Sequence, residues 1–254
     1  LRNRMTLPSA FLDRAIAHRA LHDIRDGRPE NSLAAIRAAI AGGYGIEIDL
    51  QPSADGRAMV FHDDTLDRLT GATGRVADQA AATLGEIPLT GSSEGIPTLD
   101  AVLALVGGQV PLLIEIKDQD GQMGPGVGAL EAATAAALAG YEGPVALMSF
   151  NPHAVAELAR LMPGLPRGLT TCGFAAAHWP ELTEETRARL RLIPDIDRVG
   201  ASFISHHAHD LGAPRVAEVK QAGLPVLSWT IRTPAEEAAA RQVADNVTFE
   251  CYLP

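Results

Sequence analysis

The chain has 254 residues and a mass of 26.7 kDa, with 46% hydrophobic and 20% charged residues, which is typical of a soluble globular enzyme. Its net charge of -10 argues against a general nucleic-acid-binding protein, which would usually be basic. Cys172 and Cys251 give neither a zinc-binding spacing nor a disulfide framework, and no apolar run approaches the ~20 residues of a membrane span. Residues 1–5 lack the apolar core of a signal peptide, so we expect a cytoplasmic protein. The absence of Met at position 1 leaves open that the native start was trimmed.

The chain begins with the pattern of a strand followed by a helix. Residues 15–19 predict a short strand that ends in polar residues. Apolar residues then recur at helical spacing over residues 33–40. Asn31 or Ser32 is the expected N-cap of this helix, and Gly42-Gly43 is its expected end.

The next strand carries two acidic residues on one face. In the extended run 45–50, successive side chains point to opposite sides, so Glu47 and Asp49 share a face and apolar residues occupy the other. Adjacent carboxylates on an apolar strand resist losing water and repel each other, and a divalent cation between them removes both penalties. Carboxylate oxygens suit Mg²⁺, Ca²⁺ or Mn²⁺. The alternative is a strand whose acidic residues pair with arginines across a surface.

A long irregular stretch separates this strand from the next long one. Residues 58–62 predict a short strand that ends at His62. Residues 63–97 contain turn signals and exceed a typical connection, so we interpret them as an insertion with a functional or packing role. Residues 98–105 then predict a helix.

A further apolar strand, residues 112–117, supplies a third carboxylate. Glu115 and Lys117 share one of its faces. A lone pair of this kind is more often a salt bridge than a site. Beside Glu47 and Asp49, however, it completes a set of side chains that would hold one metal ion and one anion.

The second half of the chain continues the alternation. Strand-like runs occur at residues 145–150, 168–171, 200–204, 225–230 and 246–249. Helical runs occur at residues 130–138, 152–161, 183–192, 214–222 and 234–243. About eight strand-like units, each followed by a helix, predict an α/β fold, the (β/α)8 TIM barrel.

We expect this barrel to form a single domain over residues 1–254, with residues 63–97 as a short insertion after the second barrel strand. A doubly wound open sheet is the alternative, but no Gly-rich phosphate-binding fingerprint follows the first strand. No segment after Phe249 is long enough for an eighth helix. Either the native end is missing, or an N-terminal segment such as residues 6–14 covers that side.

The predicted barrel brings polar residues to a common place, because active sites of such folds lie at the C-terminal ends of the strands. The residues at or near those predicted ends are His18, Arg19, Glu47, Asp49, His62, Glu115, Lys117, Ser149, His206 and Trp229.

These residues and their neighbours resemble the glycerophosphodiester phosphodiesterase family, a (β/α)8 barrel family related to the phosphatidylinositol-specific phospholipases C. The matching motifs stay in family order along nearly the whole chain. They are His18-Arg19, Pro29-Glu30-Asn31-Ser32, Glu47-Ile48-Asp49, Asp55-Gly56, Val60-Phe61-His62-Asp63, Leu66-Asp67-Arg68-Leu69-Thr70, Ile96-Pro97-Thr98-Leu99, Ile114-Glu115-Ile116-Lys117, Ser149-Phe150 and Ser228-Trp229-Thr230.

The resemblance implies metal-dependent hydrolysis of a glycerophosphodiester to glycerol 3-phosphate and an alcohol. It implies metal ligands at Glu47, Asp49 and Glu115, and catalytic acid–base roles for His18 and His62. It also implies that phosphate oxygens are held by Arg19 and Lys117. In the related phospholipases a substrate hydroxyl attacks first, so a cyclic phosphate is a further hypothesis.

The chain departs from the family pattern at two places. Ala20 stands where the family usually has Gly, and it is followed by a longer link, residues 21–28. Near the end, Glu250 stands where the family tends to have Asp. We expect the first departure to affect recognition of the substrate head group and the second to affect the closing strand.

Several roles stay open at this point. Glu30 is expected either to contact a ligand or to support other site residues. Trp229 either binds the substrate glycerol by stacking or caps the barrel. The run containing His206, His207 and His209 is interpreted as a polar rim of the active site, with a second metal site as the alternative.

Two other classes of function remain as alternatives, a metal-dependent TIM-barrel lyase or aldolase and a non-catalytic barrel that binds phosphorylated ligands. The expected partner is a small-molecule glycerophosphodiester, and the size of the insertion favours a small soluble diester over an intact membrane lipid. The sequence determines neither the head group, nor which divalent metal ion is bound, nor the oligomeric state.

Overall fold

Eight parallel strands close into a barrel in the computed structural model, which describes residues 4–254. Leu1–Asn3 lie outside the described residues. They belong to residues 1–5, for which the sequence predicts no signal peptide. The barrel closes because β1 pairs with both β2 and β9. The barrel strands are β1 (Ile16–Ala17), β2 (Gly45–Pro52), β4 (Leu112–Ile116), β5 (Val145–Ser149), β6 (Arg167–Thr171), β7 (Phe203–His207), β8 (Val226–Ile231) and β9 (Asn246–Phe249).

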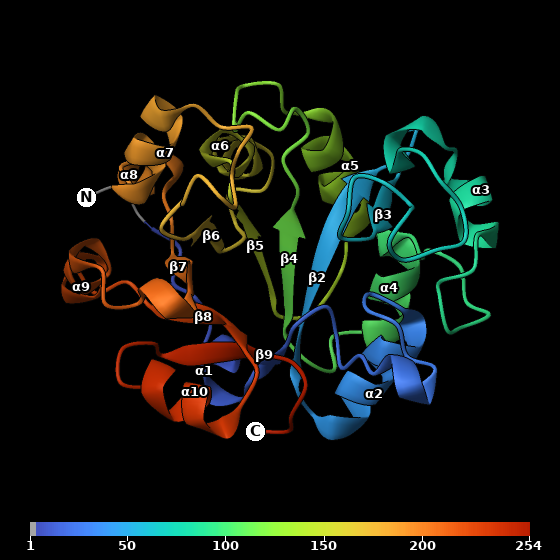
Figure 1. Cartoon of the computed structure of the whole chain (residues 1–254), viewed down its shortest axis with the longest axis horizontal. Helices are drawn as coiled ribbons and strands as arrows, with labels where there is room; N and C mark the ends of the chain where they lie inside the picture. The colour runs from blue at the N-terminus through green and yellow to red at the C-terminus, as the bar shows by residue number, and fades with distance from the viewer. Residues whose placement is uncertain (1–3) are drawn as a thin grey trace.

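Helices surround this barrel in the order that the alternating sequence predicts (Figure 1). The α-helices are α1 (Ala10–Asp13), α2 (Leu33–Gly42), α3 (Ala81–Glu86), α4 (Leu99–Val106), α5 (Ala129–Leu138), α6 (Pro152–Leu161), α7 (Glu184–Arg191), α8 (Ile196–Val199), α9 (Pro214–Gln221) and α10 (Pro234–Ala240). Short 3₁₀ turns are η1 (Ile24–Asp26), η2 (Val76–Asp78) and η3 (Ala208–Asp210). Among the described residues, no helix is both long and apolar enough to cross a membrane.

The alternation of side chains along β2 and β4 separates the core from the site. Ile46, Ile48 and Leu50 of β2 point outward into the apolar layer between strands and helices, where they are completely buried. The intervening Glu47 and Asp49 point into the barrel. Because β2 and β4 pair in parallel with Asp49 opposite Glu115, the two acidic faces meet.

The predicted strand 58–62 is not a barrel strand. Its core is β3 (Ala58–Val60), which pairs antiparallel with β2 as a hairpin. The physical reason is the length of the connection: a parallel neighbour needs a crossover of a dozen or more residues, and only the turn 53–57 lies between these strands.

The insertion, residues 63–97, is also more ordered than predicted. It contains η2 and α3, which lie beside α4 at one side of the barrel (Figure 1). Its buried apolar residues, which include Leu66, Val76 and Leu84, form a separate cluster with Met59 and Phe61. One predicted barrel strand is shifted as well, since β7 covers Phe203–His207 rather than residues 200–204, and Gly200 ends α8.

The N-terminal segment, residues 6–14, fills the N-terminal end of the barrel and does not take the place of an eighth helix. Leu7 and Phe11 pack against inward-facing residues such as Leu113 and Phe203. The side-chain amide of Asn246, at the start of β9, donates to the carbonyl oxygens of Phe11 (2.8 Å) and Arg14 (2.7 Å). The segment therefore closes the N-terminal end of the barrel, opposite the polar strand ends.

Candidate active site

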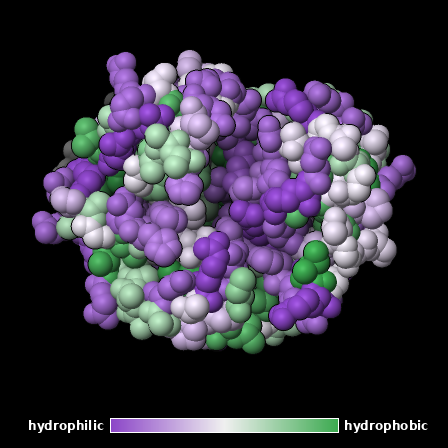
Figure 2. Space-filling view, viewed as in Figure 1, coloured by the Kyte–Doolittle hydropathy of each residue, from purple (hydrophilic) through white to green (hydrophobic). Residues whose placement is uncertain are grey.

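A cavity of about 150 Å³ opens at the C-terminal ends of the barrel strands. Figure 2 shows a hollow in this region, bordered mainly by hydrophilic residues. The lining includes every predicted catalytic, metal-binding and substrate-binding residue except Glu30: His18, Arg19, Glu47, Asp49, His62, Glu115, Lys117 and Trp229. The (β/α)8 fold thus brings these residues together as the strand-end argument predicts.

Three buried carboxylates form the floor of the site. Glu47, Asp49 and Glu115 each offer an oxygen, and these oxygens lie within 4.8 Å of one another. The Lys117 Nζ lies 2.7 Å from an oxygen of Asp49 and 2.7 Å from an oxygen of Glu115. Such a set of hard oxygen donors fits a divalent cation of the Mg²⁺, Ca²⁺ or Mn²⁺ class.

Neighbouring cations compensate the negative charge of Asp49 more than that of Glu47. Burial, followed by the negative charges of Asp49 and Glu115, raises the pKa of Glu47 well above its ordinary value. Burial also opposes ionisation of Asp49, but Lys117 and other nearby cations outweigh it and hold the pKa of Asp49 far below its ordinary value. The charge of Glu47 is therefore less compensated than that of Asp49, which is a second reason that a divalent cation fits this site.

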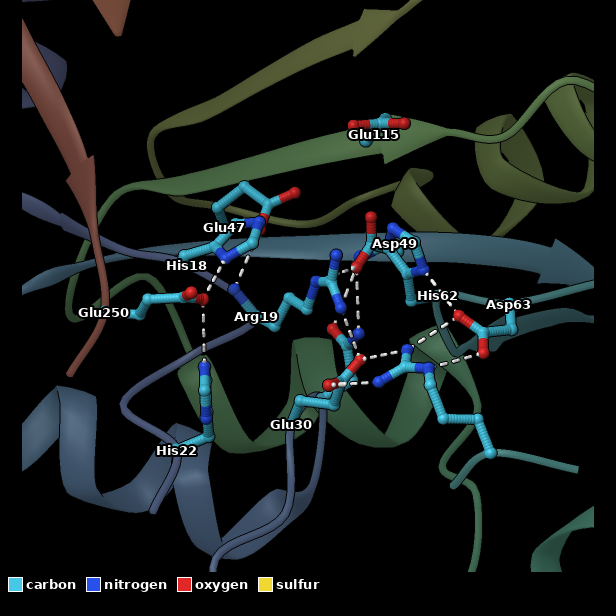
Figure 3. Close-up of polar contacts among 12 residues, drawn as sticks. His18, Arg19, His22, Glu30, Glu47, Asp49, His62, Asp63, Glu115 and Glu250 are labelled. Carbon is cyan, nitrogen blue, oxygen red and sulfur yellow. Dashed lines mark hydrogen bonds and ion pairs between the residues drawn. The ribbon is translucent and has the colours of Figure 1, made fainter. Parts of the chain in front are cut away.

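Arg19 follows β1 in a left-handed backbone conformation (φ 51°) that turns the chain into the site. Its backbone N–H donates to Glu47 Oε2 at 2.8 Å, and its guanidinium donates to Glu30 Oε1 at 2.7 Å. The guanidinium Nε also lies 3.7 Å from Asp49 Oδ2. Arg19 is thereby held beside the carboxylates, with its charge facing the cavity (Figure 3).

His18 is oriented by a carboxylate at the end of β9. Its Nδ1 donates to Glu250 Oε2 at 2.6 Å, which leaves Nε2 as the other ring nitrogen, available to act on a ligand. Burial lowers the pKa of His18, and the hydrogen bond to Glu250 opposes that effect without cancelling it. His18 is accordingly neutral at neutral pH.

His62 is held in the same way, although it follows the hairpin strand β3. The amide of Phe61 donates to the Asp49 carbonyl at 2.9 Å, so the returning hairpin carries the next residue back to the site. His62 Nδ1 hydrogen-bonds Asp63 Oδ1 at 2.7 Å. Burial opposes ionisation of Asp63, but hydrogen bonds from His62 and Arg68 outweigh it and keep the pKa of Asp63 well below its ordinary value.

Arg68, from the insertion, joins the two sides of the site. Its guanidinium makes two hydrogen bonds of 2.7 Å to Asp63 and two of 2.9 Å to Glu30. Asp63 contacts His62, and Glu30 contacts Arg19. A continuous chain of charged contacts therefore runs from His62 through Arg68 to Arg19.

Glu30 lies outside the group of three carboxylates, and its contacts are with arginines. The neighbouring Asn31 is not the N-cap of α2, because Ser32 accepts the hydrogen bond from the amide of Ala35. Asn31 instead donates its side-chain amide to Asp49 Oδ2 at 2.9 Å and accepts from the Asp49 amide at 3.3 Å. It fixes the orientation of that carboxylate.

Trp229 forms part of the apolar wall of the cavity. Its indole N–H donates to the Ser205 carbonyl at 3.0 Å, and its ring packs edge-on against Phe150 at a centroid distance of 5.5 Å. Ser149 does not line the cavity, since its hydroxyl donates to the Ile116 carbonyl at 2.6 Å. Trp229 is thus a fixed aromatic surface in the wall of the cavity.

The histidine run does not form one polar rim. His206 is buried on the outer face of β7, where its Nδ1 contacts the Thr171 hydroxyl at 2.8 Å and its Nε2 contacts Asp210 at 3.2 Å. His207 packs against Trp229 and against the exposed His209. The three rings do not group around a common point among the described residues, because neighbouring residues on a strand face opposite ways.

Sequence reasoning missed the residues that orient the site. Asn31, Asp63 and Arg68 all lie in motifs that carried the family resemblance, yet Asn31 was considered only as an N-cap, and no role was assigned to Asp63 or Arg68. Glu250 stood out only as a departure from the family pattern. Nothing in the sequence marked His22, whose Nε2 lies 3.5 Å from Glu250 Oε2.

Comparisons with known proteins agree with this geometry. The model of the Glycerophosphoryl diester phosphodiesterase family matches residues 18–247. The chain is 27% identical over 242 residues to YhdW of Bacillus subtilis, named as a candidate glycerophosphodiester phosphodiesterase, with 91% of this chain and 90% of that protein covered. It is 35% identical over 160 residues to a glycerophosphodiester phosphodiesterase of Caldanaerobacter subterraneus, which covers 58% of this chain and 63% of that protein.

Among solved structures, the chain is similar to an Oleispira antarctica phosphodiesterase in complex with the product sn-glycerol-3-phosphate. The TM-score is 0.76 at 26% identity, with 96% of this chain and 94% of that chain covered.

Proposed function

Because the chain belongs to the glycerophosphoryl diester phosphodiesterase family and is therefore a glycerophosphodiester phosphodiesterase, we propose that it hydrolyses small glycerophosphodiesters to glycerol 3-phosphate and an alcohol with the help of a divalent metal ion. The observation that carries this proposal is the convergence of three buried carboxylates, two cationic side chains and two oriented histidines on one cavity. The product bound to the Oleispira antarctica relative supports glycerol 3-phosphate as the product here.

Glu47, Asp49 and Glu115 would hold the metal ion, which we assign to the Mg²⁺, Ca²⁺ or Mn²⁺ class. A cation held there would polarise the phosphate and favour ionisation of the attacking hydroxyl. Asn31 keeps Asp49 oriented toward this point through its two hydrogen bonds. The backbone N–H of Arg19 orients the Glu47 carboxylate in the same way, because it donates a hydrogen bond to it.

Arg19 and Lys117 hold the phosphate of the substrate. Both cations line the cavity beside the carboxylates, so their N–H groups can donate to non-bridging phosphate oxygens. Charge builds up on those oxygens during phosphoryl transfer, and preorganised donors in a buried site stabilise it without further rearrangement. Trp229 would pack against the glycerol moiety.

His18 and His62 act as the acid–base pair. One imidazole takes the proton of the attacking hydroxyl, and the other donates a proton to the leaving alkoxide. Glu250 and Asp63 each engage an Nδ1, so the Nε2 atoms are the ones that exchange protons with the substrate. Neutral His18 suits the role of the base at neutral pH.

The attacking hydroxyl is the one that neighbours the phosphate on the glycerol, which gives a cyclic phosphate that water then opens. Phosphorus NMR during turnover should detect this species. Incorporation of solvent oxygen in a single step, with no cyclic species on any timescale, would show that water attacks directly.

The test of the proposed function is release of glycerol 3-phosphate from glycerophosphocholine. The purified protein is assayed with chelator and after adding back Mg²⁺, Mn²⁺ or Ca²⁺, beside His62→Ala and a control, His178→Ala, at an exposed residue. Metal-dependent release that is lost only in His62→Ala would support the proposal. No release with any metal, from a folded protein that binds one, would contradict it.

We also propose that residues 1–254 form one domain. The insertion is tied to the rest of the chain by contacts that include the hydrogen bond from the Ala34 amide to Glu94 at 2.9 Å and the ion pair between Arg68 and Glu30. Limited proteolysis that released a stable fragment from either side of the insertion would contradict this proposal.

A further inference from the structure

Two histidines and a carboxylate from three separate segments meet beside the active-site cavity. His18 follows β1, His22 lies in the link 21–28, and Glu250 follows β9. One ligand atom from each lies within 4.8 Å of the other two. Figure 3 shows the rings of His18 and His22 on opposite sides of the Glu250 carboxylate.

The second histidine has an unsatisfied nitrogen at this point. His22 Nε2 is buried and makes no hydrogen bond among the described residues; its contact with Glu250 Oε2, at 3.5 Å, is a long ion pair. Buried polar atoms are normally paired, so an unpaired nitrogen aimed at two other potential ligands indicates a missing partner. The other carboxylate oxygen, Oε1, accepts from Arg232 Nε at 2.7 Å, which leaves Oε2 for the two rings.

The cluster can be reached from a second cavity. A cavity of about 600 Å³ lies between the link 21–28 and the C-terminal residues, and His22 and Glu250 line it. His18 lines the smaller active-site cavity. An ion could therefore reach this cluster without passing through the substrate site.

We propose that His18, His22 and Glu250 form a second metal site, which takes Zn²⁺ or a similar borderline ion. Two imidazole nitrogens and one carboxylate oxygen are typical zinc ligands, whereas the all-oxygen set on the cavity floor favours hard cations. Zinc bonds of about 2.0–2.2 Å place tetrahedral ligand atoms roughly 3.3 Å apart. The His22–Glu250 separation of 3.5 Å already fits, and the 2.6 Å contact between His18 and Glu250 lengthens by less than an ångström.

Zinc at this site inhibits the enzyme, an effect that rests on the proposed role of His18 in catalysis. The ion replaces the contact between His18 Nδ1 and Glu250. The metal then holds the imidazole, and the carboxylate no longer accepts its hydrogen bond. Because the ion does not occupy the substrate cavity, kcat falls while KM changes little.

The experiment titrates buffered Zn²⁺ into the Mg²⁺-activated enzyme and follows diester hydrolysis. His22→Asn removes one zinc ligand, and His178→Asn is the control at an exposed histidine. Each variant is compared with its own zinc-free rate. We expect the zinc concentration for half-inhibition to rise at least about 10-fold in His22→Asn, since losing even a hydrogen-bond partner of a metal ligand typically costs that much affinity.

Two outcomes would overturn the proposal. Equal inhibition of wild type and His22→Asn that excess Mg²⁺ relieves would show that zinc acts at the three carboxylates. An anomalous-scattering map of zinc-soaked wild-type crystals with no peak between His18 and His22 would exclude the site without any variant.

Zinc binding is also measured directly, by competition with a chromophoric chelator. This measurement decides between one site and two even if no diester is hydrolysed. Failure of the proposed function is therefore distinguishable from failure of the zinc site.

Discussion

Arg68 offers the sharpest test of how the site is held together. Its guanidinium spans two carboxylates, and those carboxylates in turn contact His62 and Arg19. Arg68 itself does not line the cavity, so it acts as a positioning residue. Arg68→Met keeps much of the side-chain length and removes all four hydrogen bonds. Arg68→Lys keeps the charge but cannot form the two-pronged contacts.

The expected loss of activity exceeds the expected loss of stability. The Arg68 side chain is 48% exposed, so solvent screens its ion pairs, and their removal should cost only about 1 kcal/mol. For a protein of this size that corresponds to a fall in Tm of about 2–4 °C. A well-placed general acid or base contributes about 10²–10⁴-fold to the rate, and loosening its orientation should remove about 10-fold from kcat. We expect Arg68→Lys to fall between Arg68→Met and wild type.

The assay measures kcat and KM for glycerophosphocholine together with thermal unfolding. Arg57→Met is the matched control, because Arg57 pairs with Asp100 at 2.8 Å on the surface and both side chains are about half exposed. A kcat for Arg68→Met equal to that of Arg57→Met, at a similar Tm, would refute the positioning role. A loss of kcat that merely parallels a large fall in Tm would mean that Arg68 is only structural.

Three further predictions concern separate parts of the molecule. The folded-state pKa of Glu47 lies above its ordinary value of 4.5, so the unfolded state loses this proton first as pH rises. The metal-free wild type should lose stability relative to Glu47→Gln as pH increases above about 4.5. A saturating divalent cation should reverse this difference, because it binds the wild-type carboxylate; identical thermal unfolding curves at every pH would contradict this. Trp229→Ala should raise KM more than it lowers kcat in steady-state kinetics, whereas Trp229→Phe should keep most of the packing on Phe150; unchanged KM in both would exclude a role in binding. Phe11→Ala should cost about 3–5 kcal/mol in denaturant unfolding, because the ring is completely buried in the barrel end; the exposed Leu253→Ala should cost almost nothing.

The floor of the site was predictable because local rules govern it. Alternation along a strand places Glu47 with Asp49 and Glu115 with Lys117. Parallel neighbours in a barrel bring both pairs to the same end, and the register of Asp49 opposite Glu115 confirms the meeting of the two faces. The barrel itself followed from the alternation of strands and helices, and the structure confirms it.

The direction of β3 was not predictable from the pattern of residues 58–62 alone. A short apolar run reads the same in a barrel strand and in a hairpin strand, and only pairing with β2 decides between them. His62 lies at the cavity because the β2–β3 hairpin brings the chain back to the site, and it does not end a barrel strand. The prediction of its place was correct, and residues 58–60 do form a strand, but that strand pairs antiparallel with β2 outside the barrel.

The contacts that orient the site lay beyond the reach of sequence reasoning. Glu250 meets His18 across 232 positions, and Arg68 meets Glu30 across 38. Neither pair shares a strand or a helix, so no periodicity links its members.

The sequence by itself determined the barrel, the residues at its strand ends and the family, because these depend on local periodicity and on short motifs. Only the tertiary structure decided which carboxylate orients which histidine, how Arg68 joins the two halves of the site, and that His22 approaches Glu250. The physical reason is that such contacts depend on loop geometry and on the reach of side chains after the barrel has closed. They join residues far apart in the chain, so no local sequence pattern predicts them.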